Sequence, residues 1–138
     1  MSEKVRIRAA LELGNNKSKE SKEQLIRNLS TLNSFVRDAV VESLVNIKDV
    51  DFLCKKIHNE HRYVRRGIVQ ALGRIGGNKA SKQIIESLYD KEWGVRMYAA
   101  EALGNIGKPE FAKFLNQLLK DEHQWPREEA MKSLKKLN

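Results

Sequence analysis

The chain has 138 residues, of which 41% are hydrophobic and 32% are charged. These proportions are typical of a globular protein and exclude wholesale disorder, and the length favours a single domain. The 26 Lys and Arg residues exceed the 18 Asp and Glu residues by eight. This excess raises nucleic acid, or another anionic molecule, as a candidate partner.

Cys54 is the only cysteine, which excludes an internal disulfide framework and favours a reducing compartment. No apolar run approaches the roughly 18 residues of a membrane-spanning segment. Residues 1–6 lack the apolar stretch of a signal peptide. We therefore expect a cytoplasmic protein with no membrane partner, in which Cys54 is buried and inert.

Five segments of similar sequence follow one another along the chain. They are VRIRAALELGNN from Val5, VRDAVVESLVNI from Val36, VRRGIVQALGRIG from Val64, VRMYAAEALGNIG from Val95 and PREEAMKSLKKLN from Pro126. Their starts are 31, 28, 31 and 31 residues apart. Apolar or small residues at the first, fifth, sixth and ninth positions are typical of an amphipathic helix. The regular spacing predicts one structural repeat stacked several times.

A second helical pattern precedes each of the last four segments. Its apolar residues lie 11, 10 and 7 positions before the segment start, as in Leu25, Ile26 and Leu29. We call this helix the A helix of a repeat, and the helix with the Val-Arg motif the B helix. The prediction is an all-α fold of about nine helices in one domain. It comprises a half repeat over 1–17 and full repeats over about 18–48, 49–76, 77–107 and 108–138.

Several residues predict where the A helices begin. Ser21 with Gln24 three residues later resembles a capping box, and Asp49 and Asn78 are candidate N-caps. Pro109 suits the first position of a helix. Three fewer residues join the second repeat to the third than join the other repeats, so we expect a tighter turn there.

Glycines mark the ends of the B helices and their contacts. Gly107 and the pair at 76–77 follow B helices, where a residue that tolerates positive φ closes the last turn. Gly14, Gly73 and Gly104 occupy the tenth position of their segments. Their spacing does not match a phosphate-binding loop, so we expect these glycines to allow close helix packing.

The strings VRRGIVQALGRIG and VRMYAAEALGNIG resemble the HEAT-like repeat family, in the short-repeat form found in bilin lyases of phycobilisome proteins. The resemblance covers nearly the whole chain. It implies a right-handed α-α superhelix, or α-solenoid, whose B helices line a concave surface. Pro126 and Lys135 depart from the pattern, as is expected of a terminal repeat. The family includes lyase subunits and adaptors, so the resemblance implies no single function.

An arginine recurs at the second position of every segment, as Arg6, Arg37, Arg65, Arg96 and Arg127. These arginines would form a phosphate-binding ladder if their side chains were free. The interpretation we favour is structural: each guanidinium group binds carboxylates or helix-end carbonyls between neighbouring repeats.

The third, fourth, seventh and eleventh positions are left free by the motif, and the resemblance places them on the concave surface. They include five basic and five acidic residues, a balance that favours a protein or peptide over a phosphate backbone. Several are of types enriched at binding hot spots. The predicted partner-binding residues are Arg66, Gln70, Arg74, Trp93, Met97, Tyr98 and Glu101.

Other aromatic and apolar residues have alternative interpretations. Trp93 and Tyr98 would cover the seams between repeats if they do not bind a partner. Phe35, Tyr63 and Trp125 each precede a segment's first residue, so we interpret them as structural. Ile7 and Leu11 either form a self-association or partner patch or cover the end of the stack. We expect a monomer, with self-association through these two residues as the alternative.

Little in the sequence supports catalysis. His58 and His61 lack a third ligand, so we expect them to be solvated rather than bound to a metal, and we expect His123 to lie on an exposed loop. Some HEAT-repeat hydroxylases hold two irons with His-Glu pairs directly after the Val-Arg step. Here those places read Arg66-Gly67 and Met97-Tyr98. We therefore predict a non-catalytic binding scaffold with no cofactor and no metal.

Two alternative functions remain open. One is an accessory subunit of a lyase-type enzyme, which only the family resemblance suggests. The other is salt-sensitive nucleic-acid binding through basic A helices and loops. The residues concerned would be Lys17, Lys19, Lys22, Lys55, Lys56, Arg62, Lys79 and Lys82.

Overall fold

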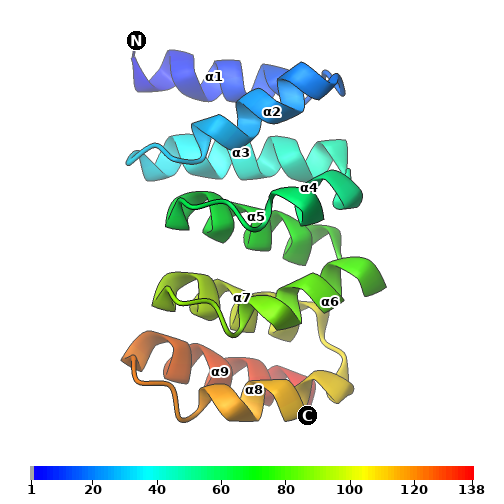
Figure 1. The fold of residues 1–138 in the computed structure, drawn as a ribbon, viewed down its shortest axis with the longest axis vertical. Coiled ribbons are helices and arrows are strands. Elements are labelled where there is room, and N and C mark those ends of the chain that lie inside the picture. The colour runs from blue at the N-terminus through cyan, green and yellow to red at the C-terminus, as the bar shows by residue number, and fades with distance from the viewer. Residues whose placement is uncertain (1) are drawn as a thin grey trace. The chain divides into compact units, whose positions relative to one another are not determined.

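The computed structural model describes residues 2–138, which form nine α-helices, one 3-10 helix and no strand. The chain divides into an N-terminal half that ends at Ala71 and a C-terminal half that begins at Leu72. The helices are drawn in Figure 1. They are α1 (Glu3–Leu13), α2 (Lys19–Asn28), α3 (Ser34–Ile47), α4 (Val50–Lys56), α5 (Arg62–Ile75), α6 (Asn78–Ser87), α7 (Trp93–Ile106), η1 (Pro109–Phe111), α8 (Ala112–Leu118) and α9 (Gln124–Leu137). The all-α prediction is confirmed.

The predicted apolar columns form the core of each half. In the N-terminal half, α1 packs against α2 and α3, and residues such as Leu25, Val40 and Ile68 are completely buried. In the C-terminal half, α7 packs against α6 and α9. The columns are less well buried in α1 and α9, where Val5 is 50% exposed and Met131 is 53% exposed.

Glycines at the tenth position let successive B helices approach closely, as predicted. In the N-terminal half, the Ser43 hydroxyl donates to the Ala10 carbonyl at 2.7 Å, and a Cβ on Gly14 would lie 2.6 Å from Ser43 Oγ. The C-terminal half repeats the arrangement, because the Ser133 hydroxyl donates to the carbonyl of Ala100 at 2.7 Å. Each of these hydrogen bonds provides a buried serine hydroxyl with a partner. A residue larger than glycine at the tenth position would push the serine away from this acceptor.

The ends of the A helices differ in part from the prediction. Asp49 is an N-cap as expected, since its carboxylate accepts from the Phe52 N–H at 3.1 Å. The N-cap of α2 is Ser18 rather than Ser21, and the Ser18 hydroxyl accepts from the Ser21 N–H at 3.1 Å. Asn78 is the first residue of α6 rather than its cap, and its side-chain oxygen accepts a bond from Lys108 instead.

The prediction of a tighter turn before the third repeat is wrong. Two residues, 48–49, separate α3 from α4, and two residues also separate α5 from α6. The three missing residues belong to the A helix itself, because α4 has 7 residues whereas α2 and α6 have 10. Gly107 ends α7 as predicted, with φ of 81° and its N–H bonded to the Leu103 carbonyl at 3.0 Å.

Candidate binding surface

The arginine column holds the loops that connect A helices to B helices. Four of its members donate from Nη1 to the carbonyl six residues earlier, at 2.7–2.9 Å. These bonds are Arg37 to Thr31, Arg65 to Asn59, Arg96 to Asp90 and Arg127 to Asp121. The structural interpretation is confirmed, with the correction that these four carbonyls belong to the arginine's own repeat. Arg6 and Arg96 also bond the following repeat, at Thr31 and Asp121.

Arg96 and Asp121 form a buried, bidentate ion pair. The distances are 2.7 Å from Nε to Oδ2 and 3.0 Å from Nη2 to Oδ1, and the two side chains are 11% and 7% exposed. Burial alone would raise the pKa of Asp121. The hydrogen bonds from Arg96 and from the His123 N–H, together with the arginine charge, outweigh that effect and lower it. The pair therefore fixes the loop before α9 against the first turn of α7.

In the N-terminal half, the predicted binding residues Arg66 and Gln70 are half-buried on α5. Three guanidinium groups surround the ring of Tyr63. The Cζ atom of Arg37 lies 4.3 Å from the ring centroid, and those of Arg62 and Arg66 each lie 5.2 Å from it. Cation–π contact with the ring partly compensates for holding three like charges together. The cluster is positively charged and suits an acidic group.

The C-terminal half contains the other five predicted binding residues. Arg74 is exposed on the last turn of α5, whereas Met97 and Tyr98 are half-buried on α7. The Trp93 ring stacks on that of His123, with centroids 4.3 Å apart and planes inclined by 5°. Trp93 thus covers the contact between α7 and the start of α9, as the seam interpretation requires. His123 is the N-cap of α9 and is half-buried, so the prediction of an exposed loop is wrong for it.

Glu101 lies in a mixed-charge group on α7 and α9. Burial raises the pKa of Glu101, and the nearby Glu129 raises it further, while Lys136 and Lys132 oppose the increase. Lys136 also donates to the Asn105 side chain at 2.8 Å. The group therefore carries charges of both signs.

The remaining sequence predictions have mixed outcomes. Phe35 is 64% exposed and Trp125 is 49% exposed, while Tyr63 is half-buried under its arginines. A shared structural role for the three stays a prediction. Cys54 is half-buried rather than buried. Ile7 and Leu11 line a shallow groove of about 420 Å³ on α1, and both interpretations of this patch stay open.

No metal site is assembled in the part of the chain that the structure describes. Among residues 2–138, no group of three or more His, Cys, Asp or Glu side chains is placed to hold an ion. His61 instead accepts from the Tyr63 N–H through Nδ1 at 3.1 Å. Over the same residues, no helix is both long and apolar enough to cross a bilayer.

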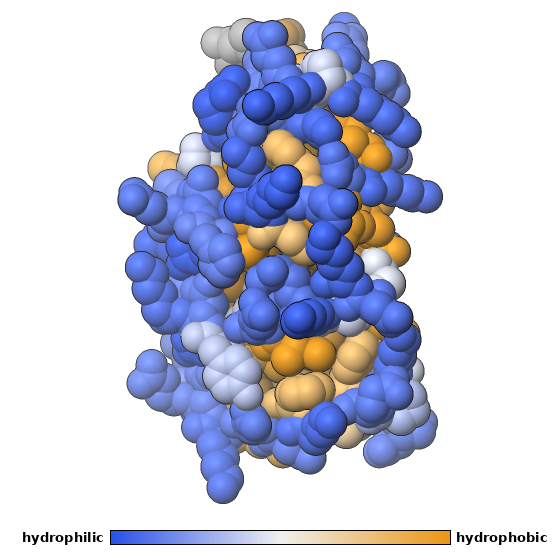
Figure 2. Space-filling view, turned by 45° about the vertical axis from the view of Figure 1, so that its right-hand side comes forward, coloured by the Kyte–Doolittle hydropathy of each residue, from blue (hydrophilic) through white to orange (hydrophobic). Residues whose placement is uncertain are grey.

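The repeat pattern did not predict a groove that lies between α6 and the η1–α8 segment. Ile85, Phe111 and Phe114 line it together with polar residues. Figure 2 shows apolar surface between hydrophilic side chains on the face of the molecule that it draws. A position-by-position comparison of the A helices shows that Ser81 and Phe111 replace Lys22 and Asp49, whereas Ile85 and Phe114 match Ile26 and Phe52.

Comparison with known proteins agrees with this architecture. Residues 50–135 match the family model for HEAT repeats, and no curated protein is significantly similar to the chain. Human deoxyhypusine hydroxylase in complex with glycerol has a similar structure, with a TM-score of 0.68 and 20% identity. The complex of CpcE and CpcF of phycocyanin lyase from Nostoc sp. PCC7120 is also similar, with a TM-score of 0.64 and 19% identity. An engineered protein is similar with a TM-score of 0.56 and 20% identity.

These matches establish the fold alone. The alignments cover 91%, 99% and 99% of this chain, and 46%, 60% and 74% of the hydroxylase, lyase and engineered chains. The repeat columns, the all-α structure and the family match lead to one conclusion. The chain belongs to the HEAT repeat family and has the α-α superhelix fold of that family.

Proposed function

We propose that the chain is a non-catalytic scaffold that binds a protein or peptide on the exposed face of its B helices. The observation that supports this proposal is that the motif residues of the B helices are occupied by the core and the loops, whereas other residues of these helices stay exposed. The apolar columns fill the core and the arginine column holds the loops. Six other B-helix residues have neither role and are at least partly exposed: Arg66, Gln70, Arg74, Met97, Tyr98 and Glu101. A stacked scaffold loses little ordering entropy on binding.

The charges suggest what each half would recognise. In the N-terminal half, Arg62 and Arg66 beside Tyr63 would bind acidic side chains of the partner through paired hydrogen bonds. In the C-terminal half, Glu101 and Glu129 would accept a lysine or arginine. A partner segment with both signs of charge fits this balance better than a uniformly charged polymer. The CpcE–CpcF structure, a complex between two chains, supports a protein partner by analogy only.

The test is capture of a partner by the immobilised chain, with Arg74→Glu combined with Tyr98→Ala. We expect the double variant to lose the partner, by at least about tenfold in affinity once the partner is purified, because it reverses one charge and removes one anchor. Its helical circular dichroism should be unchanged. Tyr89→Ala with Lys120→Glu is the matched control, since both residues are exposed and lie outside the B helices. Full capture by the first variant would overturn the proposal.

Nucleic-acid binding is the alternative, and two contacts count against it. Lys22 pairs with Asp49 at 2.6 Å and Lys56 pairs with Glu23 at 2.7 Å, so part of the basic A-helix surface is already neutralised. Nuclease treatment during capture separates the two functions. If all bound material disappears with nuclease, and affinity for arbitrary duplexes falls steeply with salt, the alternative replaces the scaffold proposal.

A further inference from the structure

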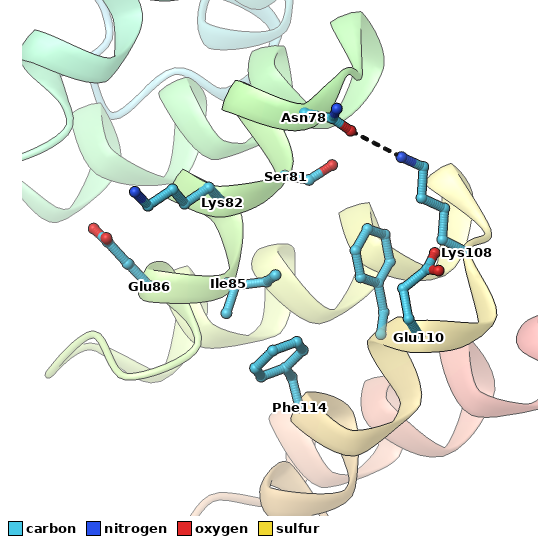
Figure 3. Close-up of a pocket in the computed structure, with 9 residues that line it drawn as sticks. Asn78, Ser81, Lys82, Ile85, Glu86, Lys108, Glu110 and Phe114 are labelled. Carbon is cyan, nitrogen blue, oxygen red and sulfur yellow. Dashed lines mark hydrogen bonds between the residues drawn. The ribbon is translucent and has the colours of Figure 1, made fainter.

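A groove of about 590 Å³ runs between α6 and the η1–α8 segment of the C-terminal half. Its apolar part consists of Ile85, Phe111 and Phe114, and Phe111 is almost completely buried. The polar residues Asn78, Ser81 and Lys108 lie together in the upper part of Figure 3, while Ile85 and Phe114 lie below them. Lys82, Glu86 and Glu110 complete the lining. In Figure 3, Lys82 and Glu86 lie on the left and Glu110 lies on the right beside Lys108, so charged side chains border the apolar residues.

The corresponding groove of the N-terminal half has a similar size but a more strongly charged lining. It lies between α2 and α4, measures about 540 Å³, and is lined by charged residues apart from Phe52. Lys22 spans it to reach Asp49 and lies 5.2 Å from the Phe52 ring centroid. Counted back from the segment starts, Ser81 takes the place of Lys22 and Phe111 that of Asp49. The ion pair of one groove is thus replaced by a small hydroxyl and an aromatic ring in the other.

The Ser81 hydroxyl is a second, independent indication of a ligand. Ser81 is only 5% exposed, and its Oγ atom has no hydrogen-bond partner among the described residues. Buried hydroxyls in native proteins are nearly always paired with protein, water or ligand. In Figure 3 this hydroxyl points toward the end of the groove where Lys108 donates to Asn78 at 3.1 Å. That bond uses one of three ammonium N–H groups and has a neutral acceptor.

We propose that this groove binds a small aromatic carboxylic acid. The aromatic ring would lie on Ile85, Phe111 and Phe114, and the carboxylate would accept from the Ser81 hydroxyl and the Lys108 ammonium group. The volume is within the roughly 300–1,000 Å³ of small-molecule sites, which are typically apolar with a few polar groups that fix orientation. Hydrogen bonds to a carboxylate from a cation are stronger than those to a neutral acceptor. This site is separate from the proposed B-helix surface and takes a different class of ligand.

The first experiment is a titration of the full ¹⁵N-labelled chain with indole-3-acetate, followed by NMR. We expect saturable shifts of amide signals from α6, η1 and α8, including those of Ser81 and Lys108. Indole-3-acetamide, which has the same ring without the charge, should bind at least about tenfold more weakly. The absence of saturable shifts, shifts confined to other helices, or equal affinity for the acid and the amide would each overturn the proposal.

Variants then separate a ligand-binding hydroxyl from a structural one. Ser81→Ala and Lys108→Met should each weaken indole-3-acetate binding about tenfold, whereas Lys120→Met, at an exposed position outside the groove, should not change it. Ser81→Ala should leave the melting temperature unchanged or raise it, since it removes an unpaired buried hydroxyl. Ser81→Lys, which installs the residue of α2, should abolish binding. A Ser81→Ala variant that melts earlier and binds indole-3-acetate normally would contradict the proposal.

Discussion

Replacing Asp121 by alanine is expected to lower the free energy of unfolding by about 3–5 kcal/mol, the typical effect of removing one partner of a buried ion pair. The reason is that Arg96 would keep its buried charge without the carboxylate that accepts from its Nε and Nη2 atoms. The His123 N–H would also lose its bond to the Asp121 side chain at 2.9 Å. Urea unfolding followed by circular dichroism measures the loss.

The ion pair between Lys22 and Asp49 provides a matched control. The Asp49 side chain is 34% exposed and the Lys22 side chain 17% exposed, so solvent screens this pair more strongly. Asp49→Ala should therefore remove mainly an N-cap, at about 1 kcal/mol. Equal effects at the two sites would contradict the argument that burial makes the Arg96–Asp121 pair important.

The same pair makes stability depend on pH in a predictable direction. Because the folded-state pKa of Asp121 lies below its ordinary value, the stabilisation is complete above about pH 4, near the unfolded-state pKa. It is lost as the pH falls through the lower folded-state pKa. The stability difference between the natural chain and Asp121→Asn should thus be largest at neutral pH and shrink in acid. A difference that stays constant down to pH 2 would contradict this assignment.

The B helices could be predicted well because each of their residues repeats with a fixed role. A valine, two small or apolar residues and a leucine at helical spacing have one favourable arrangement, with that face in the core. The neighbouring arginine could be given a structural role for the same reason, since an identical polar residue in every repeat suggests an identical contact. Arg37, Arg96 and Arg127 do have structural contacts, but they donate to loop carbonyls of their own repeat rather than to a neighbouring repeat.

The A helices could be predicted less well because several residues compete for each local role. Ser18 and Ser21 are both good N-caps, and only the observed bond from the Ser21 N–H to Ser18 Oγ distinguishes them. The shorter third repeat led to the prediction of a tighter turn, whereas the helix α4 is shorter instead.

A periodic sequence pattern could not predict individual contacts between residues that are far apart in the sequence. Trp93 and His123 are 30 positions apart, and their stacking depends on how α7 meets the start of α9. The Ser81 groove depends on side chains from two successive A helices, which vary from repeat to repeat. The candidate binding residues were placed on B helices correctly, but their role as a partner surface stays a prediction.

Gly104→Ala is the other substitution with a large expected effect, and it should destabilise the C-terminal half by about 1–3 kcal/mol. Alanine is the better helix former by about 1 kcal/mol, so a mid-helix glycine is normally improved by this change. Here the added Cβ would lie 2.6 Å from Ser133 Cβ and 2.9 Å from Ser133 Cα. Since one of these atoms is backbone, α7 and α9 would have to separate, which would weaken the Ser133 bond to the Ala100 carbonyl.

A double-mutant cycle with Ser133→Gly distinguishes this close approach from a general helix effect. If the collision is the cause, Ser133→Gly should be less harmful in the Gly104→Ala background than in the natural chain, giving a coupling of at least about 0.5 kcal/mol. Gly14→Ala tests the same geometry independently, because its Cβ would meet Ser43 Oγ at 2.6 Å in the N-terminal half. Additive effects at Gly104 and Ser133, or a stabilising Gly104→Ala, would show that the repeats tolerate a wider spacing. In that case the glycine of the motif would not be what sets the distance between successive B helices.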